Sequence, residues 1–161
     1  MNDTLDDLAA ELGRRLMARG RMLATAESCT GGWIAKCCTD IAGSSAWFDR
    51  GFITYSNEAK HDMLGVSEAL LASQGAVSEA VVRAMAEGAL SNSRAQQTVA
   101  VSGIAGPGGG SAEKPVGTVW FAWAVKDGVA RTQVVQFAGD REAVRRQTVE
   151  LAIRGLMDEY E

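Results

Sequence analysis

Apolar residues near the start of the chain follow the spacing of a helix. They recur every three or four positions among charged residues and consist of Leu5, Leu8, Leu12 and Leu16. We expect this amphipathic helix to end near Gly20. The apolar run 21–26 then predicts a strand, the polar cluster 27–32 a tight turn, and the helical spacing from Trp33 to Ile41 a second helix.

The same alternation continues through the middle of the chain. The second helix is expected to stop at 43–45, and the run 51–55 predicts a short strand. Helices follow from Glu58 and over 67–74. Ser78 is a plausible N-cap for a further helix, which leads into a run typical of a buried strand at 98–102.

The last third of the chain predicts a loop, a hairpin and a helix. The loop 103–115 holds five glycines and both prolines of the chain. Two strands at about 116–126 and 130–138 flank Asp127-Gly128, a dipeptide that favours a tight hairpin turn. Asp140 then caps a final helix.

Alternating helices and strands that finish in a hairpin indicate an α/β sandwich on a mixed sheet. The strands should run parallel where helices cross over and antiparallel at the end. Ligands of open α/β sheets collect beyond the carboxyl ends of the strands. The polar turns 27–32, 55–60 and 103–114 should therefore converge on one site.

Length and charge narrow the class of protein. With 161 residues, one domain over 1–161 is expected. A net charge of −4 provides no basic excess for nucleic acid, and no apolar run approaches the roughly 20 residues of a membrane span. The acidic amino terminus does not resemble a secretory signal, so we expect a soluble, cytoplasmic protein.

Cysteine and histidine usage directs the search for chemistry. Cys29, Cys37 and Cys38 cannot all pair within the chain and lack a redox or zinc spacing, so buried, reduced thiols are expected. His61 is the only histidine and cannot build a multi-histidine metal site. We expect no metal and a catalytic base other than histidine.

A serine and a lysine are the candidates for nucleophilic catalysis. Ser28 stands at the expected start of a helix, where backbone N–H groups favour a developing oxyanion, although a simple capping role competes with this interpretation. Lys60 can act as a general base only if burial or nearby cations lower its pKa, and Tyr55 could reach the same pocket rim. A solvated lysine is the alternative, and Cys29 is a weaker nucleophile because its only imidazole partner would be His61.

The glycine-rich loop fits neither a Walker loop nor a dinucleotide fingerprint. Its glycines still allow backbone N–H groups to approach a phosphate or ribose. Arg141, Arg145 and Arg146 could add positive charge beside it. A flexible loop and a solvated basic helix face are the competing interpretations.

Several long motifs in the same order give the chain a family resemblance. It resembles the CinA carboxy-terminal domain family over nearly its whole length, through residues 26–32, 43–45, 54–60, 75–78, 102–110 and 114–118. It looks most similar to the stand-alone members, the PncC-type nicotinamide-nucleotide amidases. The resemblance implies a three-layer α/β/α sandwich with a mixed, mainly parallel sheet, and hydrolysis of nicotinamide mononucleotide (NMN) to nicotinate mononucleotide and ammonia in pyridine nucleotide recycling.

The resemblance also implies a site without metal or cofactor. It places Lys60 as the catalytic lysine with Tyr55 as a supporting hydroxyl, Ser45 as the first choice of nucleophile and Ser28 as the alternative. The residues expected to bind substrate are Thr30, Gly31, Ser102, Gly103, Gly106 and Arg141, with Arg141 on the phosphate.

A different class of function stays open. The family's historical name suggests a non-catalytic, nucleotide-binding regulatory module linked to competence or DNA damage. A homodimer is also expected, because Trp47 and Phe48 are interpreted as exposed aromatics near the site.

Overall fold

A computed structural model describes residues 4–158 of the chain, so the first three and the last three residues of the predicted 1–161 domain, including part of the acidic amino terminus, lie outside it. Its centre is a five-stranded sheet in the order β2-β1-β3-β4-β5. The strands are β1 (Leu23–Glu27), β2 (Phe48–Ile53), β3 (Gln97–Gly103), β4 (Thr118–Val125) and β5 (Arg131–Gln136). β1 pairs in parallel with β2 and β3, whereas β4 runs antiparallel to both of its neighbours. The sheet is therefore mixed, and four of the five strands point the same way.

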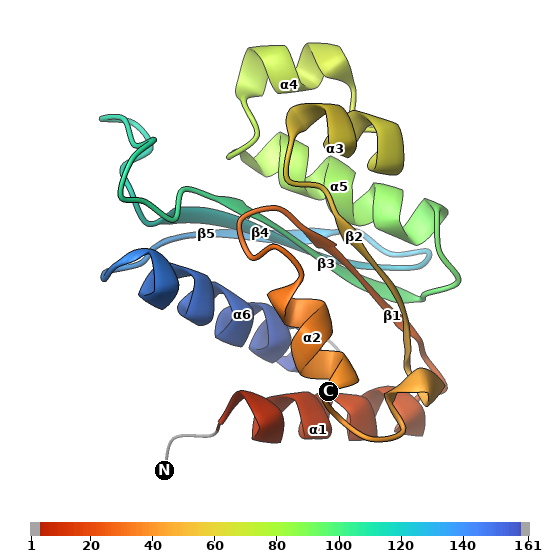
Figure 1. Cartoon of the computed structure of the whole chain (residues 1–161). Helices are drawn as coiled ribbons and strands as arrows, with labels where there is room; N and C mark the ends of the chain where they lie inside the picture. Colours follow the sequence, from red (N-terminus) through yellow and green to blue (C-terminus); the bar gives the residue numbers. More distant parts are fainter. Residues whose placement is uncertain (1–3, 159–161) are drawn as a thin grey trace.

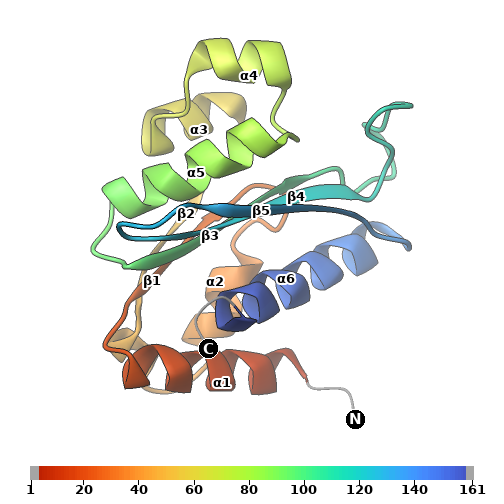
Figure 2. The ribbon, with the colours of Figure 1, turned by 180° about the vertical axis from the view of Figure 1, so that it is seen from behind.

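Helices cover both faces of this sheet (Figure 1, and from behind in Figure 2). One side carries α1 (Leu5–Ala18), α2 (Trp33–Thr39) and α6 (Arg141–Asp158). The other carries α5 (Glu79–Ser91), on which α3 (Asn57–Leu64) and α4 (Glu68–Gln74) lie. The predicted α/β/α sandwich is confirmed. No helix of the described chain is long and apolar enough to cross a membrane.

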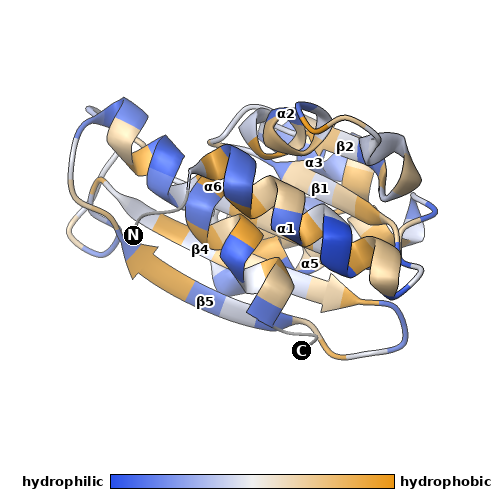
Figure 3. Cartoon of the chain, turned by 90° about the horizontal axis from the view of Figure 1, so that it is seen from below, coloured by the Kyte–Doolittle hydropathy of each residue, from blue (hydrophilic) through white to orange (hydrophobic). Residues whose placement is uncertain are grey.

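The alternation of side chains along the central strands builds a core on each face. Phe121 and Trp123 of β4 pack toward α6, and the neighbouring Ala122 faces α5. The leucine stripe of α1 is buried as predicted. Seen from below, hydrophilic and hydrophobic residues alternate along α1, which is the pattern of a helix with one buried face (Figure 3).

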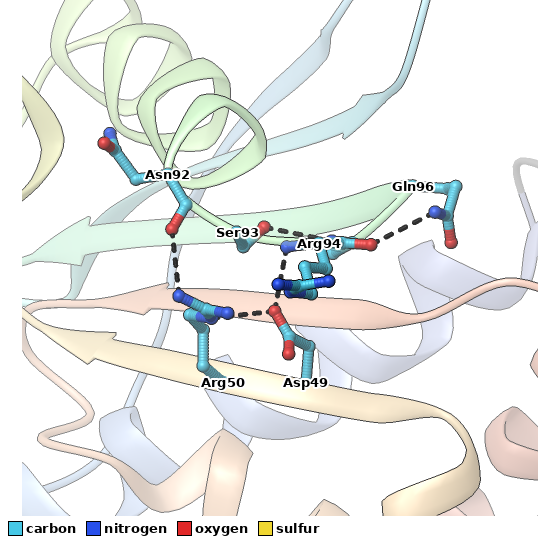
Figure 4. Close-up of polar contacts among 7 residues, drawn as sticks. Asp49, Arg50, Asn92, Ser93, Arg94 and Gln96 are labelled. Atoms are coloured by element: carbon cyan, nitrogen blue, oxygen red, sulfur yellow. Dashed lines mark hydrogen bonds and ion pairs between the residues drawn. The ribbon is translucent and has the colours of Figure 1, made fainter.

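A polar cluster ties the start of β2 to the connection between α5 and β3 (Figure 4). The Asp49 carboxylate accepts hydrogen bonds from the Arg94 backbone N–H at 2.9 Å and from Arg50 Nε at 2.8 Å. Arg50 also donates to the Asn92 carbonyl at 3.3 Å. Burial would raise the pKa of Asp49, but these donors outweigh it and hold the pKa below its usual range.

Two sequence expectations about this region are wrong. β2 begins at Phe48 and ends at Ile53, so Tyr55 lies beyond the strand that was predicted to contain it. Trp47 is buried, and Phe48 is half-buried. The reason is that α1 approaches closely at Gly13, where a Cβ atom would stand only 2.5 Å from the Trp47 ring.

Candidate active site

Ser28 and Lys60 meet at the carboxyl end of the sheet. Ser28 follows β1 directly, and Lys60 is the fourth residue of α3, whose N-cap Ser56 accepts a hydrogen bond from the Ala59 N–H. Lys60 Nζ lies 3.0 Å from Ser28 Oγ. Because the Lys60 side chain is only 1% exposed, its ammonium is held largely out of water.

Two backbone carbonyls fix the orientation of the Lys60 amine. Nζ donates to the Thr54 carbonyl at 2.8 Å and to the Tyr55 carbonyl at 3.2 Å. Burial lowers the pKa of Lys60 from 10.5 to about 8. A neutral amine has two N–H bonds and one lone pair. If a neutral Lys60 directs both hydrogens to the carbonyls, its lone pair is left for the Ser28 hydroxyl, an arrangement that suits a general base.

A buried carboxylate organises the turn that carries Ser28. Glu27 is fully buried, and its oxygens accept hydrogen bonds from the Thr30 hydroxyl at 2.6 Å and the Thr25 hydroxyl at 3.2 Å. They also accept from the backbone N–H groups of Ile34 and Ala35 at 2.9 and 3.0 Å. Gly32 at the N-cap of α2 offers no side chain, so Glu27 satisfies the first turn of this helix in its place.

Arg145 of α6 holds the same turn from the face of the sheet that carries α1, α2 and α6. Its Nε donates to the Cys29 carbonyl at 3.0 Å and its Nη2 to the Thr30 carbonyl at 3.1 Å. The guanidinium carbon also stands 5.5 Å from the centre of the Trp33 ring. The turn is thus fixed by a carboxylate and a guanidinium from two different elements.

Arg141 links the other two predicted segments. Its Nη1 donates to the Gly106 carbonyl at 2.9 Å, and its Nη2 lies 3.4 Å from the Tyr55 hydroxyl. The Tyr55 side chain is exposed and its hydroxyl contacts Arg141, so the part of Tyr55 that contacts Lys60 is its carbonyl. The predicted convergence of 27–32, 55–60 and 103–114 is confirmed by these contacts.

The other residues predicted to bind substrate lie in the turn that follows Ser28 or at the end of β3. Ser102 follows Val101, the strand partner of Glu27, and therefore lies beside Ser28. Gly103 ends β3 against Val119, where a Cβ atom would come within 2.5 Å of that side chain. Gly31 belongs to the turn itself and has a φ of 59°. The Thr30 hydroxyl is engaged with Glu27, so its side chain is held inside the protein.

The structure does not bring Ser45 to Lys60. Ser45 is exposed in a short 3-10 turn, Ser44–Ala46, which precedes β2. Lys60 follows the carboxyl end of β2, so the six residues of that strand separate the two, a length of roughly 20 Å at about 3.3 Å a residue. The serine that contacts Lys60 is therefore Ser28, the alternative candidate, and not Ser45, the first choice.

Cys29 and His61 are unsuited to nucleophilic catalysis here. Burial raises the pKa of the Cys29 thiol to about 11, so the reactive thiolate is scarce at neutral pH. His61 Nδ1 lies 2.8 Å from the Val66 carbonyl, and its Nε2 lies 3.4 Å from a Glu68 carboxylate oxygen, on the outer side of α3.

Sequence reasoning missed the roles of Glu27 and of the Thr54 carbonyl. The signal for Glu27 was its position: a charged residue that follows the apolar run directly and is the last residue of the fully buried strand β1. No sequence signal marks a backbone carbonyl, because every residue has one. Thr54 is placed by its own N–H, which donates to the Glu27 carbonyl at 2.8 Å.

The fold and the site together define a class of α/β protein in which a buried lysine contacts a serine at the end of a parallel strand. The chain belongs to the CinA C-terminal domain family, whose model matches residues 5–160. It is 59% identical over 156 residues to the nicotinamide-nucleotide amidohydrolase PncC of Escherichia coli K12, covering 97% of this chain and 94% of that protein. It is 54% identical to the PncC of Pseudomonas putida, covering 96% of each chain. The crystal structure of the competence/damage inducible protein CihA from Agrobacterium tumefaciens superposes with a TM-score of 0.96 at 46% identity, covering 100% of this chain and 98% of that one.

Proposed function

We propose that this chain is a single-domain nicotinamide-nucleotide amidohydrolase that converts NMN to nicotinate mononucleotide and ammonia, with Ser28 as nucleophile and Lys60 as general base. The relatives with this activity match the chain over nearly its full length. The observation that carries the mechanism is the 3.0 Å contact between Lys60 Nζ and Ser28 Oγ, with both carbonyl acceptors already on the amine.

Acylation begins when neutral Lys60 takes the Ser28 hydroxyl proton. The oxygen then attacks the carboxamide carbon, and backbone N–H groups of the turn hold the resulting oxyanion. As the carbon–nitrogen bond breaks, protonated Lys60 returns the proton to the leaving nitrogen. Ammonia departs and an ester on Ser28 remains.

Deacylation repeats these steps with water. Lys60 takes a proton from the attacking water, and the hydroxide adds to the ester carbonyl. Collapse of this second tetrahedral intermediate breaks the bond to Ser28 Oγ, which recovers its proton from Lys60. The products are nicotinate mononucleotide and the free enzyme, and no step uses a metal or a cofactor.

Arg141 binds the phosphate of the nucleotide in this proposal. Its guanidinium is exposed at the rim between Tyr55 and Gly106, where a dianion can reach it. Ser102 and Gly103, at the end of β3 next to Ser28, contact the substrate in the same proposal.

The competing function, a nucleotide-binding regulatory module without chemistry, is separated by one assay. Purified protein is incubated with NMN, and ammonia and the pyridine product are measured with and without a chelator. The amidase releases equal amounts of ammonia and nicotinate mononucleotide, and the chelator changes neither. Binding of NMN in calorimetry without ammonia release would favour the regulatory module.

A homodimer and a cytoplasmic location complete the proposal. Because Trp47 is buried, it cannot form a contact between two copies of the chain. The exposed side chains of Ile53 and Tyr55 beside the site are the apolar surface proposed for that contact. The three cysteines are free and buried, as is typical of a reducing compartment. Light scattering coupled to gel filtration should give twice the 17.0 kDa chain mass, and a single-chain mass would contradict the dimer.

A further inference from the structure

We infer that the Thr30 backbone N–H is the oxyanion donor of the site, and that Arg145 is the positioning residue that aims it by holding the peptide between Cys29 and Thr30. This inference rests on the proposed amidase reaction and adds to it a residue with a defined role. It starts from the two carbonyl contacts of the Arg145 guanidinium.

The peptide group between Cys29 and Thr30 has a fixed orientation. In a trans peptide the carbonyl and the N–H point in opposite directions. Arg145 comes from α6 and holds the Cys29 carbonyl at 3.0 Å. The Thr30 N–H of the same peptide therefore points away from Arg145. The helix α3, which carries Lys60, lies on the face of the sheet opposite α6 (Figure 1).

Some backbone N–H groups of the turn already have acceptors within the protein. The Gly31 N–H donates to the Ser28 carbonyl, and the Trp33 N–H donates to the Thr30 carbonyl. The N–H groups of Cys29, Thr30 and Gly32 donate to no backbone acceptor within residues 4–158. Of these three, only the Thr30 N–H belongs to a peptide whose carbonyl Arg145 holds. It stands two residues after Ser28 in the turn that begins at the proposed nucleophile, so it is the oriented donor available to the oxyanion.

The turn contains two glycines, so its backbone conformation is not fixed by its own residues. Gly31 and Gly32 both have positive φ angles, of 59° and 103°, and glycine adopts many other conformations as readily. Without the guanidinium, the peptide before them can rotate and aim its carbonyl at the site. Such a rotation would replace a stabilising donor with a repelling oxygen.

Arg145 and Arg141 differ in exposure and in contacts, and this difference assigns positioning to Arg145 and phosphate binding to Arg141. The Arg145 head group is engaged by two carbonyls and lies over the Trp33 ring, and its side chain is half-buried. Arg141 is exposed at the rim. We therefore expect loss of Arg145 to affect the chemical step and loss of Arg141 to affect binding.

The test compares Arg145→Ala with Arg141→Ala, using Arg146→Ala on the exposed side of α6 as matched control. For each variant kcat and KM for NMN, the melting temperature, and the pH profile of kcat/KM are measured. Arg145→Ala should lower kcat by about 100-fold or more, the usual effect of losing an oxyanion donor, with KM changed little. Its melting temperature should stay above the assay temperature and the pH midpoint should not move, whereas Arg146→Ala should match the wild type.

Chemical rescue distinguishes the clamp from a general structural role. Guanidinium ion at low, non-denaturing concentration should restore part of the kcat of Arg145→Ala and none of Arg141→Ala. An Arg145→Ala variant with wild-type kcat, or one with raised KM and unchanged kcat, would overturn the inference while leaving the amidase intact. A folded variant with lowered kcat that guanidinium does not rescue would also count against it. A wild-type protein that releases no ammonia would instead refute the proposed function.

Discussion

Lys60 is the residue on which the proposed chemistry depends, because in that mechanism its protonation state decides whether Ser28 can be activated. Burial holds its pKa at about 8, which is within reach of physiological pH. The sequence predicted both the residue and the condition, a lowered pKa. It named burial and nearby cations as possible causes but could not decide between them, since the burial of Lys60 arises only in the folded chain.

The lowered pKa gives the activity a specific pH dependence. Below about 8 the amine is protonated and cannot accept the serine proton, so kcat/KM should rise about tenfold per pH unit and level off above that value. Lys60→Arg, which stays protonated, should be inactive throughout the range. Initial rates of ammonia release between pH 6 and 10 check this, and a flat profile would remove Lys60 as the base.

Cys29 provides a second test at the scale of single residues. Its thiol has a pKa of about 11 and is buried, so iodoacetamide at pH 7 should leave activity unchanged. Treated protein is assayed for ammonia release, and its modification is read by mass spectrometry. Progressive loss of activity that NMN protects against would point to a thiol nucleophile instead.

At the scale of elements, β2 shows where sequence patterns mislead. The run 51–55 was predicted as the strand, whereas the sheet accepts Phe48–Ile53. The polar residues Asp49 and Arg50 interrupt the apolar pattern at the start of this strand, so the pattern does not predict it. The strand tolerates them because they form hydrogen bonds to the distant residues Arg94 and Asn92. Helices with clear caps were predicted well, as with Ser78 before α5 and Asp140 before α6.

The Asp49 cluster should stabilise the fold in a pH-dependent manner. Its carboxylate has a lowered pKa in the folded state, so its contribution is present above the unfolded value of 3.8 and is lost as the pH falls through the folded value. Asp49→Asn should lower the free energy of unfolding by about 1–2 kcal/mol at pH 7. Urea denaturation at pH 7 and at pH 3 measures it. An equal difference at both pH values would contradict the role assigned to the charge.

At the scale of the whole molecule, the site forms because the three segments that follow β1, β2 and β3 meet at the carboxyl ends of these strands. That convergence follows from the parallel order β2-β1-β3 and was predicted from the alternation of helices and strands. A serine–lysine pair was also predicted, but which of the two serines meets Lys60 was not, because a motif resemblance does not tell which serine lies at the carboxyl end of the strands. The register of β1 and β2 decides it, since Ser28 and Thr54 follow the paired ends Glu27 and Ile53.

The most direct test of the account is therefore the kcat of Ser28→Ala against that of Ser45→Ala, with NMN as substrate and circular dichroism to confirm folding. We predict that Ser28→Ala loses activity by about a thousandfold or more. Ser45→Ala, at the other end of β2, should retain the wild-type rate. Loss of activity in Ser45→Ala with an active Ser28→Ala would contradict the proposed nucleophile and the mechanism built on it.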